Sequence, residues 1–385
     1  MKTQKTSSTE SFHETLIAAD CYADQEPAAK GAAGHGRDAR LSLARVLACF
    51  AIVTLHTVFA ANEYFIDTLT QSEDLASRFV ENNMMWAVPV FLMVTGVLQL
   101  DPRRELTWRK LYRKYIFRVA CALVVFSLLF RLFDIIMDAE TFSISGLLGV
   151  AFTEMMTGRG WGHLWYLYLL IGLYILLPFF RIVVRYCTDT DLKYLWCVYF
   201  VFTSLIPVIE GFGINIAFYI SESLIYPLYL LTGYMLKEGK LRISRGVAAA
   251  LVLGSVAAIG VLDIMKYGKG IDVPGVLFGY SSPLVIAQAA GAFALIIGMS
   301  GLQPDPAQAA VGSRFTSAVC RLDSLTFGVY LISMAFVRLI FKYAGLNPYS
   351  GPAIILLAVS VAGIFAVSCL VTAILKRIPG MRAIL

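Results

Sequence analysis

Long apolar segments recur along almost the whole chain and constrain its fold more than any other feature. We place ten of them, at 41–61, 80–100, 116–137, 163–183, 192–209, 214–236, 246–265, 283–302, 325–344 and 352–375. Crossing a bilayer takes about 20 apolar residues as a helix, and only helices or closed barrels satisfy their backbone in lipid. These segments are too long and continuous for barrel strands. The sequence therefore predicts an all-α, polytopic membrane bundle of about ten transmembrane helices.

Composition supports the same fold class. The chain is 58% hydrophobic and 15% charged, whereas soluble chains have about 45–50% apolar and about 25% charged residues. A soluble enzyme, a disordered protein, a collagen-like fibre and a disulfide scaffold are excluded. The net charge of +6 does not indicate a nucleic-acid partner, because basic residues gather in the cytoplasmic loops of membrane proteins. The seven cysteines show no CxxC spacing, so we expect no metal site.

Lysine and arginine positions predict the orientation. About 21 of them fall in the tails and alternate loops, with a dense group at 103–118, and about five fall in the other loops. Both termini are therefore predicted to be cytoplasmic, in a multi-pass protein of the inner (plasma) membrane. We expect a disordered tail at 1–39, a membrane domain at 40–378 and a short cytoplasmic tail at 379–385.

The first apolar segment carries two ionisable residues, Arg45 and His56. They are eleven residues apart, so a helix places them within roughly 20° of one face and about 16 Å apart along its axis. Ionisable side chains in a membrane face the protein interior or a water-filled cavity. Arginine suits phosphate, and histidine can take and return a proton. The alternative is an arginine that snorkels to the headgroups and a histidine satisfied by a backbone carbonyl.

Glu222 is a second candidate, because it lies inside the segment 214–236. A carboxylate at that depth is expected to be functional. It could orient His56 or bind the hydroxyl groups of a substrate. The alternative is a structural acid that is protonated or pairs with Arg131 or Arg338.

Aromatic residues gather at the start of the segment 163–183. His163, Trp165 and Tyr166 fall together there. Such residues commonly form the interfacial belt of a membrane protein, but sugars also stack on aromatic faces, so they are candidates for an acceptor site. Nearby, Arg131 and Asp134 are three residues apart, and we expect them to pair on one helix.

Several stretches together resemble the acyltransferase-3 family of integral membrane proteins. An arginine followed eleven residues later by a histidine, as in 40–56, is similar to the family's opening motif. The other matching stretches are VPVFLMVTG (88–96), the basic segment ending in KLYRKYIFR (110–118), GHLWYLYLLIGLYILLPFF (162–180) and LDSLTFGVYLIS (322–333). The resemblance covers 40–378. One departure is Ser333, which stands where many members have histidine.

The resemblance implies a membrane O-acyltransferase, of the O-acetyltransferase type, that modifies carbohydrates. Its donor would be cytoplasmic acyl-CoA, usually acetyl-CoA, used as a co-substrate rather than a bound cofactor. Its acceptor would be a hydroxyl of a cell-envelope or exported polysaccharide. Arg45 and His56 would be the essential pair. The basic segment suits the phosphates of CoA, with Arg113, Lys114 and Arg118 preferred because they lie nearest the third apolar segment. Topology alone is the alternative explanation for these charges.

The expected mechanism has His56 as general base on the acceptor hydroxyl and Arg45 on the donor. The rival hypothesis is a transporter of a small polar solute or glycan, built on the same membrane fold. In that case Arg45, His56 and Glu222 would line a path through the bundle.

Overall fold

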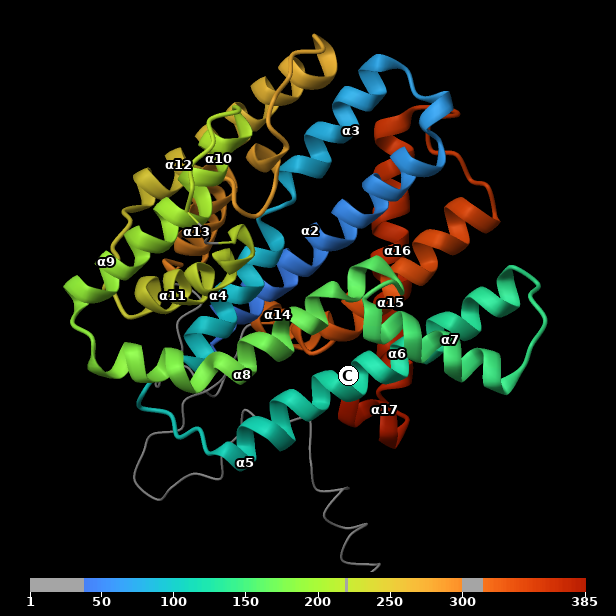
Figure 1. The fold of residues 1–385 in the computed structure, drawn as a ribbon. Helices are drawn as coiled ribbons and strands as arrows, with labels where there is room; N and C mark the ends of the chain where they lie inside the picture. Colours follow the sequence, from blue (N-terminus) through green and yellow to red (C-terminus); the bar gives the residue numbers. More distant parts are fainter. Residues whose placement is uncertain (1–37, 219–220, 300–313) are drawn as a thin grey trace, which may run out of the picture.

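The computed structural model describes residues 38–218, 221–299 and 314–385, and within these ranges it contains helices and no strands (Figure 1). Most of the predicted N-terminal tail, 1–37, therefore lies outside the described residues. Eight helical runs of the described chain are long and apolar enough to cross a membrane. They are Ala39–Tyr64, Trp108–Met137, Gly162–Tyr186, Asp189–Gly211, Arg245–Gly268, Gly275–Ile297, Thr326–Tyr343 and Ala353–Leu375. The predicted polytopic bundle is confirmed.

The individual elements subdivide these runs and add shorter helices between them. The long runs consist of α2 (Ala39–Tyr64), α5 (Trp108–Lys110), η2 (Leu111–Ile116), α6 (Phe117–Met137), η3 (Gly162–Leu164), α8 (Trp165–Tyr186), α9 (Asp189–Phe200), η4 (Val201–Leu205), α10 (Ile206–Gly211), α12 (Arg245–Asp263), η6 (Ile264–Gly268), η7 (Gly275–Phe278), α13 (Pro283–Ile297), α15 (Thr326–Arg338), η9 (Leu339–Tyr343) and α16 (Ala353–Leu375). The others are η1 (Ile66–Thr68), α3 (Gln71–Asn83), α4 (Ala87–Gln99), α7 (Ile144–Thr157), η5 (Glu222–Ile225), α11 (Tyr226–Lys237), α14 (Arg314–Asp323) and α17 (Pro379–Ile384).

Two of the ten predicted spans, 80–100 and 214–236, are not single long helices. The first breaks between α3 and α4, and the second contains α11, so their apolar helices have 13 and 12 residues. Helices of that length reach about 20 Å, against a hydrocarbon core of about 30 Å. Each has a proline in its first turn, Pro89 and Pro227. Proline is tolerated there because the first amide groups have no partner within the helix.

The two short helices pack directly against each other through glycine. A Cβ built on Gly96 of α4 would lie 2.0 Å from the carbonyl oxygen of Leu230 in α11. A Cβ on Gly233 of α11 would lie 2.1 Å from that of Met93 in α4. Small residues allow membrane helices to approach this closely. The two backbones therefore form a tight pair in the core.

The connecting segments meet on two opposite faces. On one face, which we call the basic face, Arg103 donates to Glu238 at 2.6 Å, Lys237 pairs with Asp38, and Lys376 donates to the carbonyl of Ser324 at 2.7 Å. On the other, Lys342 pairs with Asp138 at 2.8 Å, and Asn347 donates to Thr68 at 3.0 Å. Each of these contacts joins two segments that are predicted to share a side of the membrane. That the basic face is cytoplasmic stays a prediction.

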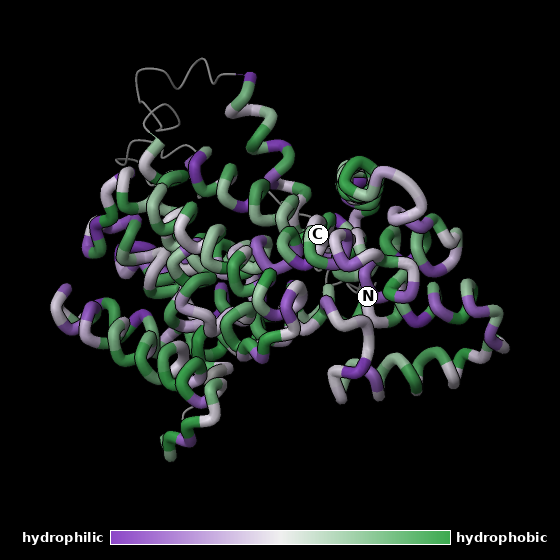
Figure 2. Tube along the Cα trace, turned by 90° about the horizontal axis from the view of Figure 1, so that it is seen from above, coloured by the Kyte–Doolittle hydropathy of each residue, from purple (hydrophilic) through white to green (hydrophobic). Residues whose placement is uncertain are grey.

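Helix α2 runs through the middle of the bundle (Figure 1). It packs against α4 and α13 and also against α14, α15 and α16. Figure 2 shows hydrophobic residues along most of the helical length and hydrophilic residues gathered toward helix ends and turns. The central position of α2 brings Arg45 and His56 into contact with the core of the protein.

Candidate active site

Arg45 forms a two-pronged ion pair with Asp323, the last residue of α14. Its Nε donates to Oδ1 at 2.6 Å, and its Nη2 donates to Oδ2 at 2.7 Å. The Asp323 side chain is 1% exposed. A guanidinium fork matches a carboxylate in this way, and the paired geometry offsets the cost of burying both charges. Sequence analysis missed Asp323; the available signal was an acid just before the stretch LTFGVYLIS, 278 residues after Arg45.

Four successive contacts along helix α2 join it to the segment formed by α14 and α15. These contacts join Ser42 to Cys320, Arg45 to Asp323, Cys49 to the carbonyl of Thr326, and His56 to Tyr330. Arg45 and His56 therefore both meet the same neighbouring segment. This confirms the geometric prediction that they share one face of α2, while their roles stay a proposal.

His56 lies in a cluster of rings. Its ring centroid is 6.2 Å from that of His163 and 6.5 Å from that of Tyr330. The residue is half-buried, and its Nδ1 is buried with no hydrogen-bond partner among the described residues. The ring is thus held by packing rather than by an ion pair.

His163, the second imidazole of this cluster, is 5% exposed. It sits in the short η3 turn that leads into α8. Its Nε2 lies 3.1 Å from the carbonyl oxygen of Leu331, and the hydroxyl of Tyr330 donates to the carbonyl of His163 itself. Two hydrogen bonds therefore join this turn to α15. The structure brings His163 beside His56, and that the two rings bind an acceptor stays a prediction.

Trp165 and Tyr166 extend the cluster in two directions. Tyr166 is buried, with its ring 5.7 Å from Tyr330. Trp165 is half-buried, and its ring centroid lies 5.6 Å from that of Tyr280 and 5.9 Å from that of Tyr226. Sequence analysis missed Tyr226 and Tyr280, because both come from other segments of the chain. A continuous series of packed rings thus leads away from His56.

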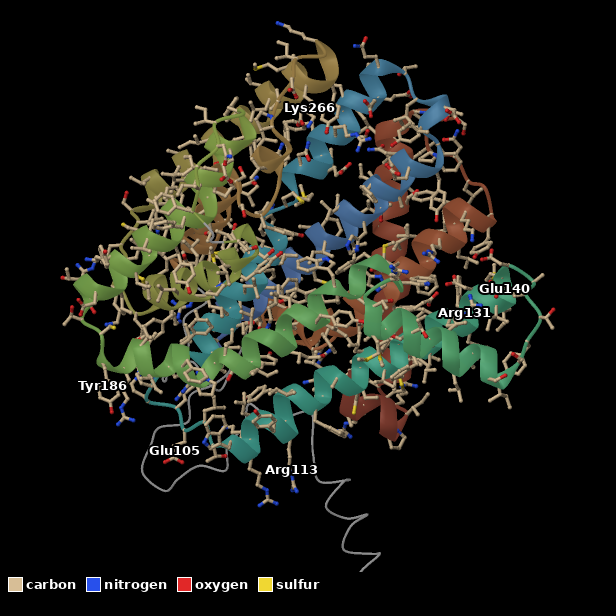
Figure 3. The ribbon with its side chains drawn as sticks, in the orientation of Figure 1. Glu105, Arg113, Arg131, Glu140, Tyr186 and Lys266 are labelled. Carbon is tan, nitrogen blue, oxygen red and sulfur yellow. The ribbon has the colours of Figure 1, made fainter. Side chains whose placement is uncertain are left out.

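The predicted pair of Arg131 and Asp134 is wrong. Arg131 instead bonds Glu140, and Figure 3 shows these two side chains pointing toward each other. Asp134 accepts from Arg338 at 2.9 Å and from the indole of Trp161 at 2.8 Å. The side chains of Arg131 and Asp134 are both less than one-fifth exposed, so each needs well-aligned partners to offset the loss of water. Partners from distant helices therefore decide the pairing.

Arg118 lies close to the Arg45 end of α2. Its Nε and Nη2 donate to the main-chain oxygens of Ile384 and Leu385 at 3.0 and 2.7 Å. Its guanidinium also lies 5.5 Å from the ring centroid of Phe327, in the first turn of α15. Arg45 and Arg118 therefore flank the junction between α14 and α15.

The other two predicted donor-binding residues lie farther out. Arg113 is exposed and points away from the helices (Figure 3). The ammonium of Lys114 lies 5.8 Å from the ring centroid of Tyr115. The structure thus groups Arg118 with Arg45, and leaves Arg113 at the edge of the basic face.

Glu222 and Ser333 complete the sequence candidates. The backbone of Glu222 begins η5, and its side chain lies outside what the structure describes. Ser333 is buried, and its hydroxyl donates to the carbonyl of Tyr330 at 3.3 Å. Ser333, which departs from the common family pattern, therefore lies on α15, three residues after Tyr330 of the His56 cluster.

A separate open hollow of about 460 Å³ lies on the basic face. Its lining residues are Asp189, Lys193, Gly239, Lys240, Leu241 and Arg242. Its basic side chains make it a second place where an anionic group could bind.

Comparison with known proteins gives one match. A family model described as an acyltransferase domain, Acyl_transf_3, matches residues 38–373. No curated protein matches, and no solved structure matches. The matched range contains Arg45, His56, His163 and Asp323.

Proposed function

The chain belongs to the acyltransferase-3 family, and from this premise we propose that it moves an acetyl group from acetyl-CoA to a hydroxyl of a cell-envelope or exported glycan. It is a multi-pass membrane acyltransferase. The observation that carries the proposal is the shared face of α2, where Arg45 and His56 meet one neighbouring segment. The N-terminus and the basic face are proposed to be cytoplasmic, in the inner membrane.

The donor is proposed to bind from the basic face. Its phosphates would meet Arg45 and Arg118, with Arg113 and Lys114 at the entrance. Arg45 already holds the oxygens of a carboxylate, and Arg118 already holds two main-chain oxygens. A phosphate is therefore a chemically similar partner for the same guanidinium groups.

The reaction is proposed to take place at His56. The imidazole takes the proton of the acceptor hydroxyl while the oxygen attacks the thioester carbonyl. The tetrahedral intermediate then collapses, the carbon–sulfur bond breaks, and the imidazolium returns the proton to the departing thiolate of CoA. The acceptor lies against His163, Trp165 and Tyr166, whose rings surround or extend the His56 cluster. Glu222 is proposed as a third catalytic group.

Membranes containing the full chain test this function directly. When the acetyl group of acetyl-CoA is labelled, the label should appear in the membrane glycan fraction. Free labelled acetate should leave that fraction unlabelled. Thermal stabilisation by CoA that grows with its concentration should accompany the transfer. If no label is transferred while CoA still stabilises the protein, the acceptor assignment is wrong.

A second candidate function, transport of a polar solute or glycan, is favoured by the short helices α4 and α11. Interrupted membrane helices that meet in the core are typical of transporters. Uptake of labelled sugar into vesicles, with no effect of CoA on thermal stability, would support transport. CoA-dependent label transfer without uptake would exclude it.

A further inference from the structure

The hydrogen bond of His163 determines where its ring carries a proton. A backbone carbonyl oxygen can only accept, so Nε2 must be the donor toward Leu331 at 3.1 Å. The ring is enclosed by Phe130, Trp161, Tyr330 and the second imidazole, none of which carries a negative charge. An imidazolium there would be buried without an anion, which is costly. The neutral ring with a proton on Nε2 has a bare lone pair on Nδ1.

That lone pair is buried and unused. Nδ1 of His163 has no hydrogen-bond partner in the part of the chain that the structure describes. Buried polar atoms are nearly always paired, and an unpaired one costs free energy. The hydrogen bond to Leu331 accounts for Nε2, but it leaves the accepting nitrogen Nδ1 without a partner in a ring that neighbours His56. An O–H or N–H group of a ligand would satisfy it.

The neighbouring imidazole limits what this ligand can be. His56 lies 6.2 Å away, centroid to centroid, and is the proposed base for the reacting hydroxyl. A hydroxyl has one hydrogen and can donate to one nitrogen, so the hydroxyl on His56 cannot also serve His163. A second hydroxyl close to the first could serve it.

We propose that His163 is a substrate-contacting residue whose Nδ1 accepts a hydrogen bond from a second hydroxyl of the acceptor. The acceptor then presents two neighbouring hydroxyl groups, one to His56 and one to His163. An acceptor with a single isolated hydroxyl leaves Nδ1 unpaired and is disfavoured. This inference rests on the proposed function and adds a specificity determinant to it.

Two matched variants separate this role from a structural one. In His163→Asn the amide oxygen lies at the level of Nδ1, so the acceptor contact is kept and the bond to Leu331 is lost. In His163→Gln the amide nitrogen reaches the level of Nε2, so the bond to Leu331 is kept and the contact is lost. The assay is label transfer from acetyl-CoA by the purified full chain, with extracted membrane glycan as the varied acceptor.

The proposal predicts that the asparagine variant retains about tenfold more kcat/KM for the acceptor than the glutamine variant. The KM for acetyl-CoA stays at the wild-type value in both. Equal losses, or a glutamine variant that is the more active, would overturn the proposal. If wild-type protein transfers no label, the proposed function fails instead, which is a different result.

A measurement on the unsubstituted site covers the case in which either variant fails to fold. ¹⁵N-histidine spectra of a full-length chain with His13→Gln and His35→Gln contain signals of two imidazoles only. The proposal predicts an unprotonated Nδ1 at His163 whose signal shifts when the glycan extract is added. A protonated Nδ1, or a signal that the extract leaves unmoved, would contradict it.

Discussion

The two ends of one face of α2 are built differently. At the Arg45 end, a guanidinium is held by charge, in a two-pronged bond to the buried carboxylate of Asp323. At the His56 end, an imidazole is held by rings, and both His56 and His163 have an Nδ1 without a partner among the described residues. The first end is suited to binding the oxygen atoms of an anion. The second is suited to receiving hydroxyl groups.

The largest effect is expected from His56→Ala, which removes the proposed base. Label transfer from acetyl-CoA should fall by about 10²–10⁴-fold. Thr54→Ala is the matched control, because its hydroxyl bonds only its own helix at the Phe50 carbonyl, 2.9 Å away, among the interactions described. If the His56 variant is as stable as the wild type and still transfers substantial label, His56 is not the base. The two ends of α2 would then not differ in function as proposed.

The next effect is expected at the charged end. Asp323→Asn leaves the Arg45 guanidinium beside a neutral amide, and breaking such a pair should cost about 3 kcal/mol of unfolding free energy. The exchange variant Arg45→Asp with Asp323→Arg restores a pair of opposite charges. Thermal unfolding should recover toward the wild-type midpoint.

The exchange variant also tests what Arg45 does. If the guanidinium must project from α2 to meet the donor, label transfer stays lost although stability returns. Recovery of both stability and transfer would show that the pair is purely structural.

A smaller effect is expected from Tyr330→Phe at the aromatic end. The variant removes the hydroxyl that donates to the His163 carbonyl and keeps the ring beside His56. Loss of one neutral hydrogen bond should lower the unfolding free energy by about 1 kcal/mol. Thermal unfolding measures this cost. A loss of transfer as large as that of His56→Ala would mean that the hydroxyl itself takes part in the reaction.

The smallest effect is expected at Asp38 on the basic face. Burial raises the pKa of this carboxyl, but bonds from Arg40 and Lys237 outweigh burial and lower its pKa to about 2. Its stabilisation is therefore present above the ordinary pKa of 3.8 and is lost as the pH falls toward 2. Asp38→Asn keeps a good N-cap for α2, so it isolates the charge.

The melting temperature of the Asp38 variant should lie below that of the wild type at pH 7. The difference in melting temperature between the variant and the wild type should be smaller at pH 3. A gap that is constant or wider at pH 3 would show that the charge of Asp38 does not stabilise this face.

The sequence predicts most of the bundle because hydropathy is a local property. It also predicts the shared face of Arg45 and His56, because a helix fixes the angle between them. Hydropathy does not register a helix break, so the short helices α4 and α11 were predicted as full spans. Pro89 and Pro227 were the local signals for those breaks.

Partners from distant segments could not be predicted in the same way. Asp323 reaches Arg45 across 278 residues, and Arg338 takes Asp134 from its neighbour Arg131. Both pairings depend on which helices become neighbours after folding. A single sequence carries little information about that choice.

The most direct test of the account is a structure of the full chain with CoA bound. We expect phosphates at Arg45 and Arg118, with the sulfur end of CoA in contact with His56. CoA bound instead in the hollow lined by Lys193, Lys240 and Arg242, with its sulfur away from His56, would contradict the account.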